Sequence, residues 1–173
     1  MPKLRTLQKS VKEIASRDLY TLSIDRRPTK TIILMKLLIP EVSTSYFPQT
    51  HNLLQLYLPT IFKSVCYNDE HLPFVKEVAR TELGHLFEHI LLEYLCIIQL
   101  ENGLDYASFE GVTNWDWTHD PKGTFYITIN AKSEELERLT TAVERTVRLM
   151  NIVLNRNQNI VDTLPIPSAS TRH

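Results

Sequence analysis

The sequence lacks the features that mark several large functional classes. Lysine and arginine number 19 against 20 acidic residues, so the net charge is −1 and the pI is near 6.6. Proteins that bind nucleic acid or anionic membranes through electrostatics usually carry a basic excess, which is missing here. There is also no G-x-x-x-x-G-K-[ST] loop for nucleotide phosphates and no G-x-S-x-G around a nucleophilic serine. We therefore expect no nucleic-acid partner, no nucleotide site and no serine nucleophile.

Long apolar runs and cysteines are scarce as well. The stretch TIILMKLLIP is too short and too interrupted to cross a bilayer, and the basic first twenty residues lack the apolar segment of a secretory signal. The two cysteines, Cys66 and Cys96, are too few for a disulfide scaffold, and their spacing fits no zinc ribbon or redox motif. We therefore expect a cytoplasmic protein without membrane association, in which both cysteines are core residues.

The rest of the composition is typical of a soluble globular domain, with 43% hydrophobic and 23% charged residues in 173. This length is sufficient for one hydrophobic core. We divide the chain into a mixed polar N-terminal segment (1–30), a single α+β domain (31–155) and a partly flexible C-terminal segment (156–173) with a short strand predicted at 159–164.

Apolar periodicity and breaker residues predict the elements of the domain. They are a buried strand (31–39), a helix interrupted by Pro59 (51–65), one long helix (73–100), two strands of a hairpin with a long tip (104–112 and 123–131), and a final helix (133–155) capped by Ser133. Helices on one face of a small, mostly antiparallel sheet make an α+β fold, and the simplest version is a ferredoxin-like, split βαβ arrangement.

The stretch GHLFEHILLEYL in the long predicted helix contains the pattern H-x-x-E-H, formed by His85, Glu88 and His89. Residues four apart lie one above the other on a helix, so the two imidazoles are neighbours. Apolar residues such as Leu86 and Ile90 mark the face toward the sheet, which places both histidines on the outward side. Two such histidines can bind zinc, and Glu88 is the candidate general base for a water whose pKa the metal lowers toward about 7.

A catalytic zinc ion usually has three protein ligands and one open position. We expect the third ligand from a carboxylate of the final helix, which offers Glu135 and Glu137 near its start and Glu144 further along. Glu93 is about 12 Å along the helix axis from His85, a long reach for direct coordination. It is better suited to accept a hydrogen bond from a ligating imidazole.

Two of these features have simpler interpretations. Two histidines among acidic neighbours on a solvated helix face are often plain surface residues, because short motifs also arise by chance. Trp115 and Trp117, in the predicted hairpin tip, could form an aromatic wall for a peptide. Packing of such a pair onto the core is the more common role, and we favour it.

The long stretch LPTIFKSVCYNDEHLPFVKEVARTELGHLFEHILLEYL resembles the N-terminal domain of cyanophycin synthetase. The matching residues are Leu58, Pro59, Cys66, Phe74, Thr81, Gly84, His85, Glu88, His89 and Glu93. The resemblance covers roughly 28–154 and is weaker in the flanking TIILMKLLIPEV and FYITINAKSEEL. Leu72-Pro73 replaces the Gly-Gly of the family, and LDYASFEGV replaces its Gly- and Arg-rich segment. The ligase modules of the synthetase are absent, so polymer synthesis is not expected.

In that family the domain binds the arginyl-aspartate polymer. In some members its H-x-x-E-H makes it a zinc metallopeptidase, similar to the pitrilysin-like (inverzincin) enzymes. The resemblance thus implies that His85 and His89 are zinc ligands and that Glu88 is the base. It also implies that the paired acids of the last helix fall on Glu134-Glu135 or on Glu137.

Our leading hypothesis is a zinc-dependent peptidase that hydrolyses a peptide or a cyanophycin-like polyamide, with the substrate strand added to a sheet edge. The alternative is a non-catalytic domain that keeps the same fold and binds a polymer or a protein. A third hypothesis is a structural or oligomerising domain that uses a metal only as a staple. The sequence leaves the oligomeric state open, a homo-oligomer included.

Overall fold

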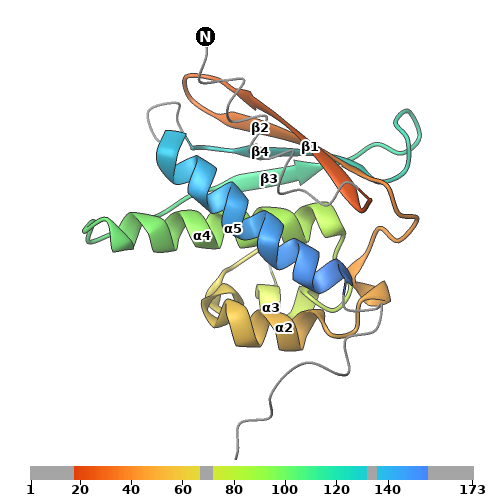
Figure 1. Cartoon of the computed structure of the whole chain (residues 1–173), viewed down its shortest axis with the longest axis horizontal. Coiled ribbons are helices and arrows are strands. Elements are labelled where there is room, and N and C mark those ends of the chain that lie inside the picture. Colours follow the sequence, from red (N-terminus) through yellow and green to blue (C-terminus); the bar gives the residue numbers. More distant parts are fainter. Residues whose placement is uncertain (1–17, 67–71, 132–135, 156–173) are drawn as a thin grey trace, which may run out of the picture.

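The computed structural model describes residues 18–66, 72–131 and 136–155 (Figure 1). Its elements, in chain order, are β1 (Tyr20–Arg26), β2 (Thr31–Leu37), η1 (Thr44–Tyr46), α2 (Thr50–Tyr57), η2 (Pro59–Lys63), α3 (Phe74–Glu77), α4 (Leu83–Glu101), β3 (Gly111–Asn114), β4 (Thr124–Ile129) and α5 (Leu136–Asn155). The predicted Ser133 cap, the strand at 159–164 and the segment 156–173 lie outside the described residues.

The four strands form one sheet in the order β1-β2-β4-β3, and every neighbouring pair is antiparallel. Since β2 and β3 both run antiparallel to β4, which lies between them, they are parallel to each other. Their connection through α4 is therefore a split βαβ unit. The predicted α+β class is confirmed. The remaining strand, β1, precedes this unit and pairs with β2, so the sheet includes part of the 1–30 segment that was expected outside the domain.

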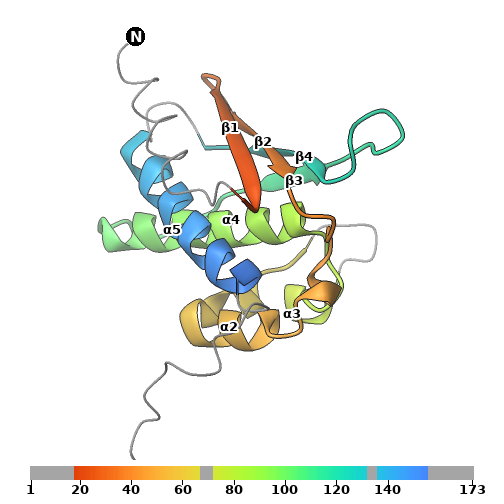
Figure 2. The same ribbon diagram turned by 45° about the vertical axis from the view of Figure 1, so that its right-hand side comes forward.

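One face of the sheet is apolar because buried side chains alternate along its strands. The inward residues are Tyr20, Leu22, Ile24, Ile33, Met35, Leu37, Phe125, Ile127 and Ile129. Helices α4 and α5 cover this face, and α2 and α3 lie beyond α4 (Figures 1 and 2). The Tyr20 hydroxyl donates to Asn151 Oδ1 at 3.1 Å, which joins β1 to α5. Helix α4 is long and apolar enough to cross a membrane by length and composition alone. Its apolar character is also that of a buried core helix.

The predicted helix over 73–100 is wrong, because the chain breaks it between Glu77 and Leu83. Backbone groups in the break bond to the loop after β2 instead of continuing the helix. Thr44 N–H donates to Thr81 O at 2.8 Å, and Leu83 N–H donates to Val42 O at 2.8 Å. These two bonds fix the start of α4 against the rest of the fold.

The other element predictions differ in detail. Pro59 separates α2 from η2, as expected of a residue without a backbone N–H. Gly103, at φ 83°, follows the end of α4, as the sequence predicted. The strand predicted over 104–112 is wrong for most of its length, because β3 begins only at Gly111. Leu104 and Tyr106 are exposed there, so no buried face holds this segment in the sheet.

Helix α4 approaches β4 very closely at Gly84. A Cβ atom built at Gly84 would lie 2.3–2.7 Å from three atoms of the Phe125 side chain. The Phe125 side chain is fully buried and contacts Trp115 and Trp117 as well, so it has little room to retreat. A glycine is therefore required at this position for α4 to pack this closely against β4.

We expect Gly84→Ala to lower the free energy of unfolding by about 1–3 kcal/mol, because it overpacks the contact between α4 and β4. Without the close contact, alanine would stabilise the helix by about 1 kcal/mol relative to glycine. A lower free energy of unfolding would therefore show that the contact with Phe125 outweighs helix propensity. Phe125→Leu, which shortens the facing side chain, should reduce the cost of Gly84→Ala in the double mutant. Urea unfolding followed by circular dichroism measures these differences.

Gly103→Ala is the matched control. A Cβ atom at Gly103 would meet nothing within 4 Å, so only its φ of 83° opposes alanine. We expect a cost of about 1 kcal/mol that Phe125→Leu does not change. A Gly84→Ala protein that is more stable than the wild type would contradict the close contact.

Candidate metal centre

The first half of α4 turns its polar residues into the protein, not toward solvent. Glu88 and His89 are only 5% and 6% exposed, and His85 is half-buried. The prediction that both histidines point outward is therefore wrong. Helix α4 is covered by β3, β4 and α5, and also by η2 and by Phe74 of α3. A helix covered on two sides has no fully solvated face, which the apolar stripe alone did not indicate.

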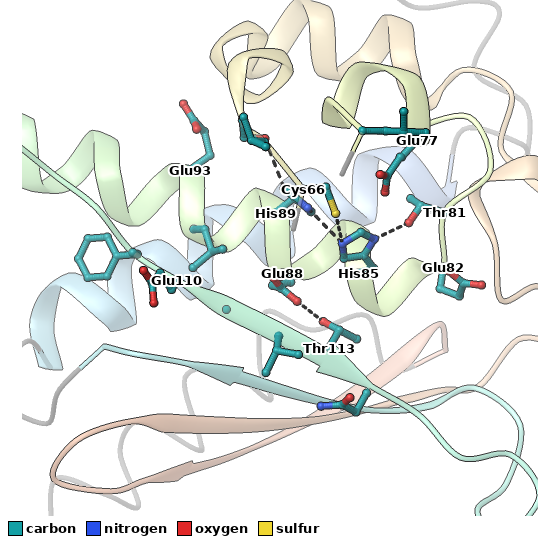
Figure 3. Close-up of a pocket in the computed structure, with 18 of the residues that line it drawn as sticks. Cys66, Glu77, Thr81, Glu82, His85, Glu88, His89, Glu93, Glu110 and Thr113 are labelled. Carbon is teal, nitrogen blue, oxygen red and sulfur yellow. Dashed lines mark hydrogen bonds between the residues drawn. The ribbon is translucent and has the colours of Figure 1, made fainter. Parts of the chain in front are cut away.

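Three potential metal ligands converge beside this helix (Figure 3). The Nε2 atoms of His85 and His89 are 3.1 Å apart, and Cys66 Sγ lies 3.2 Å from His85 Nε2. One donor atom from each of the three residues lies within 4.8 Å of the other two. Cys66 comes from the short segment after η2 and is buried. The cysteine expected to be an ordinary core residue is thus the third member of the cluster.

Two of the three spacings in the cluster are close to those around a tetrahedral metal ion, and the third is within 4.8 Å. An ion bound at about 2.0–2.1 Å from two nitrogens holds them about 3.3 Å apart, and a thiolate at about 2.3 Å lies about 3.6 Å from each nitrogen. The observed 3.1 and 3.2 Å are close to these values. A thiolate with two imidazoles is a donor set that suits zinc and similar transition metals better than magnesium or calcium.

Hydroxyl groups hold the other ring nitrogens of the two histidines. Thr81 Oγ1 lies 2.7 Å from His85 Nδ1, and Ser64 Oγ lies 3.3 Å from His89 Nδ1. Ser64 donates its own proton to Ile61 O at 2.7 Å, so its oxygen is left to accept from His89 Nδ1–H. That tautomer leaves the lone pair of His89 Nε2 directed at the cluster. Orientation of a ligand by a partner on its other nitrogen is usual in metal sites.

Burial keeps both imidazoles neutral, the form that binds a metal. Desolvation, together with the charge of neighbouring His85, lowers the pKa of His89 to about 3. Desolvation also lowers the pKa of His85, although Glu77 and Glu82 act in the opposite direction. Phe74 stacks on the His89 ring with centroids 4.1 Å apart and adds to its burial. Neutral imidazoles avoid the proton competition that weakens metal binding.

The Glu88 side chain extends from α4 toward β3. Its Oε2 accepts a hydrogen bond from the Thr113 hydroxyl (Figure 3). Burial raises the pKa of Glu88 to about 7, and the hydrogen bond from Thr113 works in the opposite direction. A carboxyl group with a pKa near neutrality can both accept and release a proton at physiological pH.

The cluster and Glu88 face a shared cavity of about 1060 Å³ between α4, the η2–α3 region and β3. Its walls carry more acidic than basic side chains. The acidic residues are Glu77, Glu82, Glu88, Glu93 and Glu110, and the basic ones are Lys76 and Arg80. Glu93 thus lines the cavity, but hydroxyl groups lie at the imidazole Nδ1 atoms, in the place that was predicted for Glu93.

Trp117 packs on the core, whereas Trp115 is in a position to contact a ligand. Trp117 packs on Phe125 and donates its indole N–H to Thr124 O at 3.1 Å, so it ties the β3–β4 loop to the core. Trp115 also contacts Phe125, but it is 40% exposed and lines the cavity. Its place at the rim makes it a candidate contact for a ligand.

The carboxylates expected as the third ligand do not meet the histidines in the part of the chain that the structure describes. Glu135 lies outside the described residues. Glu137 is exposed on α5, and neither it nor Glu144 lines the cavity. Cys66 takes their place, and one signal for it existed, since it belongs to the stretch that carries the family resemblance. Its approach to His85 depends on the chain folding back, which no local pattern predicts.

Comparisons with other proteins do not identify the site. No model of a known protein family matches the chain, and no curated protein matches it either. The resemblance to cyanophycin synthetase and to inverzincins therefore remains an expectation from the motif. The function of the site must be argued from its own residues.

Proposed function

We propose that Cys66, His85 and His89 hold a zinc ion and that the chain hydrolyses peptide or polyamide bonds, with Glu88 as the proton carrier. The observation that carries the proposal is the pairing of this ligand cluster with a buried carboxyl group whose pKa is near 7, in one open cavity. Three protein ligands leave one position of a tetrahedral ion free for water or substrate, which is typical of catalytic zinc.

The chemistry needs a source of positive charge and a group that carries a proton. A bound zinc ion would supply positive charge that lowers the pKa of water and polarises a carbonyl group. Glu88 would take a proton from the attacking water and pass it to the nitrogen of the departing amine. The pKa near 7 is that of the metal-free chain, and the charge of a bound zinc ion would lower it and favour the carboxylate that accepts the proton from water.

An extended substrate has a place to bind along β3, which is an edge strand of the sheet. Asn130 N–H bonds to Glu110 O at 3.0 Å. Because bonded and non-bonded pairs alternate in antiparallel sheets, the backbone groups of Gly111 and Thr113 point to the free edge. A peptide added there would lie beside Glu88, which contacts both residues.

The acidic walls favour substrates with basic side chains. Acidic residues outnumber basic ones around the cavity, and a cationic side chain would be attracted to it. A cyanophycin-like polyamide, which carries arginine side chains, would meet this requirement, and so would an ordinary basic peptide.

A structural metal site is the second candidate function. Cys66 and His89 are 3% and 6% exposed, and such burial also suits an ion that is held permanently. In that case a fourth protein ligand would complete the shell and no water position would remain. A non-catalytic domain that binds a polymer would use the same acidic cavity and metal, but it would not hydrolyse the polymer.

We expect the purified protein to bind about one zinc ion per chain, and Co²⁺ to replace it with a tetrahedral visible spectrum. Cys66→Ser should remove the sulfur-to-cobalt charge-transfer band, because the thiolate is a ligand. Cys96→Ser is the matched control, since these are the only two cysteines in the sequence, and it should keep the band. The same spectrum from Cys66→Ser and wild type would contradict the proposed ligand set.

We expect Glu88→Gln to lower kcat for peptide hydrolysis by roughly 10²- to 10⁴-fold with its zinc content unchanged, because the amide cannot carry the proton. Cleavage of a fluorogenic peptide library by the zinc-loaded protein measures this change. Glu137→Gln, on an exposed residue of α5, is the matched control and should be fully active. Equal cleavage by Glu88→Gln and wild type would remove Glu88 from the mechanism.

We expect peptides rich in arginine or lysine to show a higher kcat/KM than peptides of equal length rich in glutamate, because the acidic walls attract cations. The advantage should shrink as salt rises from about 0.05 to 0.5 M, since ions screen these charges. Neutral peptides provide the reference at each salt concentration. A preference for acidic peptides, or one that salt leaves unchanged, would argue against electrostatic selection.

A further inference from the structure

Strand β3 contacts the Glu88 side chain at two alternate positions. Thr113 donates its hydroxyl proton to Glu88 Oε2. A Cβ atom at Gly111 would lie 2.9 Å from Glu88 Oε1 and 3.0 Å from Cδ and Cγ. Residues two apart on a strand point to the same face, so both contacts come from the side of β3 that faces α4.

Gly111 is needed for space rather than for backbone conformation. Among the described residues, the glycines with positive φ are Gly103 and Gly123, so the backbone at Gly111 accepts an L-residue. A methyl group there would press on the far end of the Glu88 side chain and not on backbone. Alanine at this position should therefore displace the carboxyl group at small cost to the fold.

Thr113 orients the Glu88 carboxyl group, whereas Gly111 leaves space for it. A hydroxyl group has one proton to donate, and Thr113 gives it to a single oxygen of Glu88. A glutamate side chain turns about three bonds, so its carboxyl group would otherwise sample several positions in a cavity of this size. The hydrogen bond and the close strand together restrict it to one.

We propose that Thr113 is a positioning residue that holds the Glu88 carboxyl group at one place in the cavity that the candidate metal ligands also line, with Gly111 providing the space. This inference rests on the proposed role of Glu88 in hydrolysis. The Thr113 hydroxyl proton is donated to Glu88, so in this proposal Thr113 acts through Glu88 and not on the substrate. Since a displacement of about 1 Å in a reacting group can cost roughly 100-fold in rate, such a contact matters for catalysis.

The first experiment compares Thr113→Val, which removes the hydroxyl at nearly constant shape, with Thr113→Ser, which keeps it. With the zinc-loaded protein, Thr113→Val should lower kcat roughly 10- to 100-fold while KM and zinc content stay near the wild type. Thr113→Ser should recover most of kcat. Gly111→Ala should also lower kcat with little change in Tm. Thr128→Val, on β4 and away from the cavity lining, is the matched control and should behave as wild type.

The second experiment tests the link between the two side chains without any activity. Thr113→Val should lower the Tm of the zinc-loaded wild type by about 2–6 °C, the effect of one lost hydrogen bond to a buried carboxyl group. In the Glu88→Ala background the same change should leave Tm unaltered or raise it, because the hydroxyl then has no carboxyl partner.

The outcomes separate this inference from the proposed function. Equal Tm losses in both backgrounds, a loss of zinc in Thr113→Val, or equal kcat for Thr113→Val and wild type would overturn the positioning role. Equal losses of kcat in the serine and valine variants would do the same. A wild type that cleaves no peptide would overturn the proposed hydrolysis, and coupled Tm values would then still support the placement of Glu88 by Thr113.

Discussion

The structure depends on the burial of α4 from two sides. Strands β3 and β4 and helix α5 pack on this helix, and η2 and Phe74 of α3 cover another side of it. Gly84 lets the helix lie against Phe125, and backbone bonds from Thr81 and Leu83 to the loop after β2 fix its first turn. The helix cannot shift or rotate without breaking these contacts. His85, Glu88 and His89 are therefore held at defined positions.

The same burial determines the chemistry of the site. Water would compete for the hydrogen bonds of His89 and Glu88 and would keep their pKa values near the ordinary range. Enclosure lowers the pKa of His89 to about 3 and raises that of Glu88 to about 7, so the imidazole stays neutral and the carboxyl group titrates near neutrality. Two residues adjacent in sequence thus acquire different roles because they contact different surroundings, Phe74 and Ser64 for His89, and β3 for Glu88.

Much of the architecture was predictable because local patterns carry it. The short β-branched, apolar runs TIILMKL and TFYITI predicted strands, and the helical spacing after Leu83 predicted the long helix that holds His85, Glu88 and His89. The break at 78–82 was not predictable, since the apolar spacing runs through it and the bonds that cause it come from residues 42–44. The outward direction assigned to the histidines failed for a related reason: a helical stripe identifies one buried face and says nothing about a second covering layer.

The sequence by itself determined which residues can do chemistry: the H-x-x-E-H spacing places two imidazoles one turn apart with a carboxyl group between them on any helix. Only the tertiary structure decided that Cys66, and not a carboxylate of α5, completes the cluster, and that Gly111 and Thr113 face Glu88. The physical reason is range. Helical geometry relates residues within a few positions of one another, whereas these partners lie 19 to 25 residues away in the chain and meet only after the layers have packed.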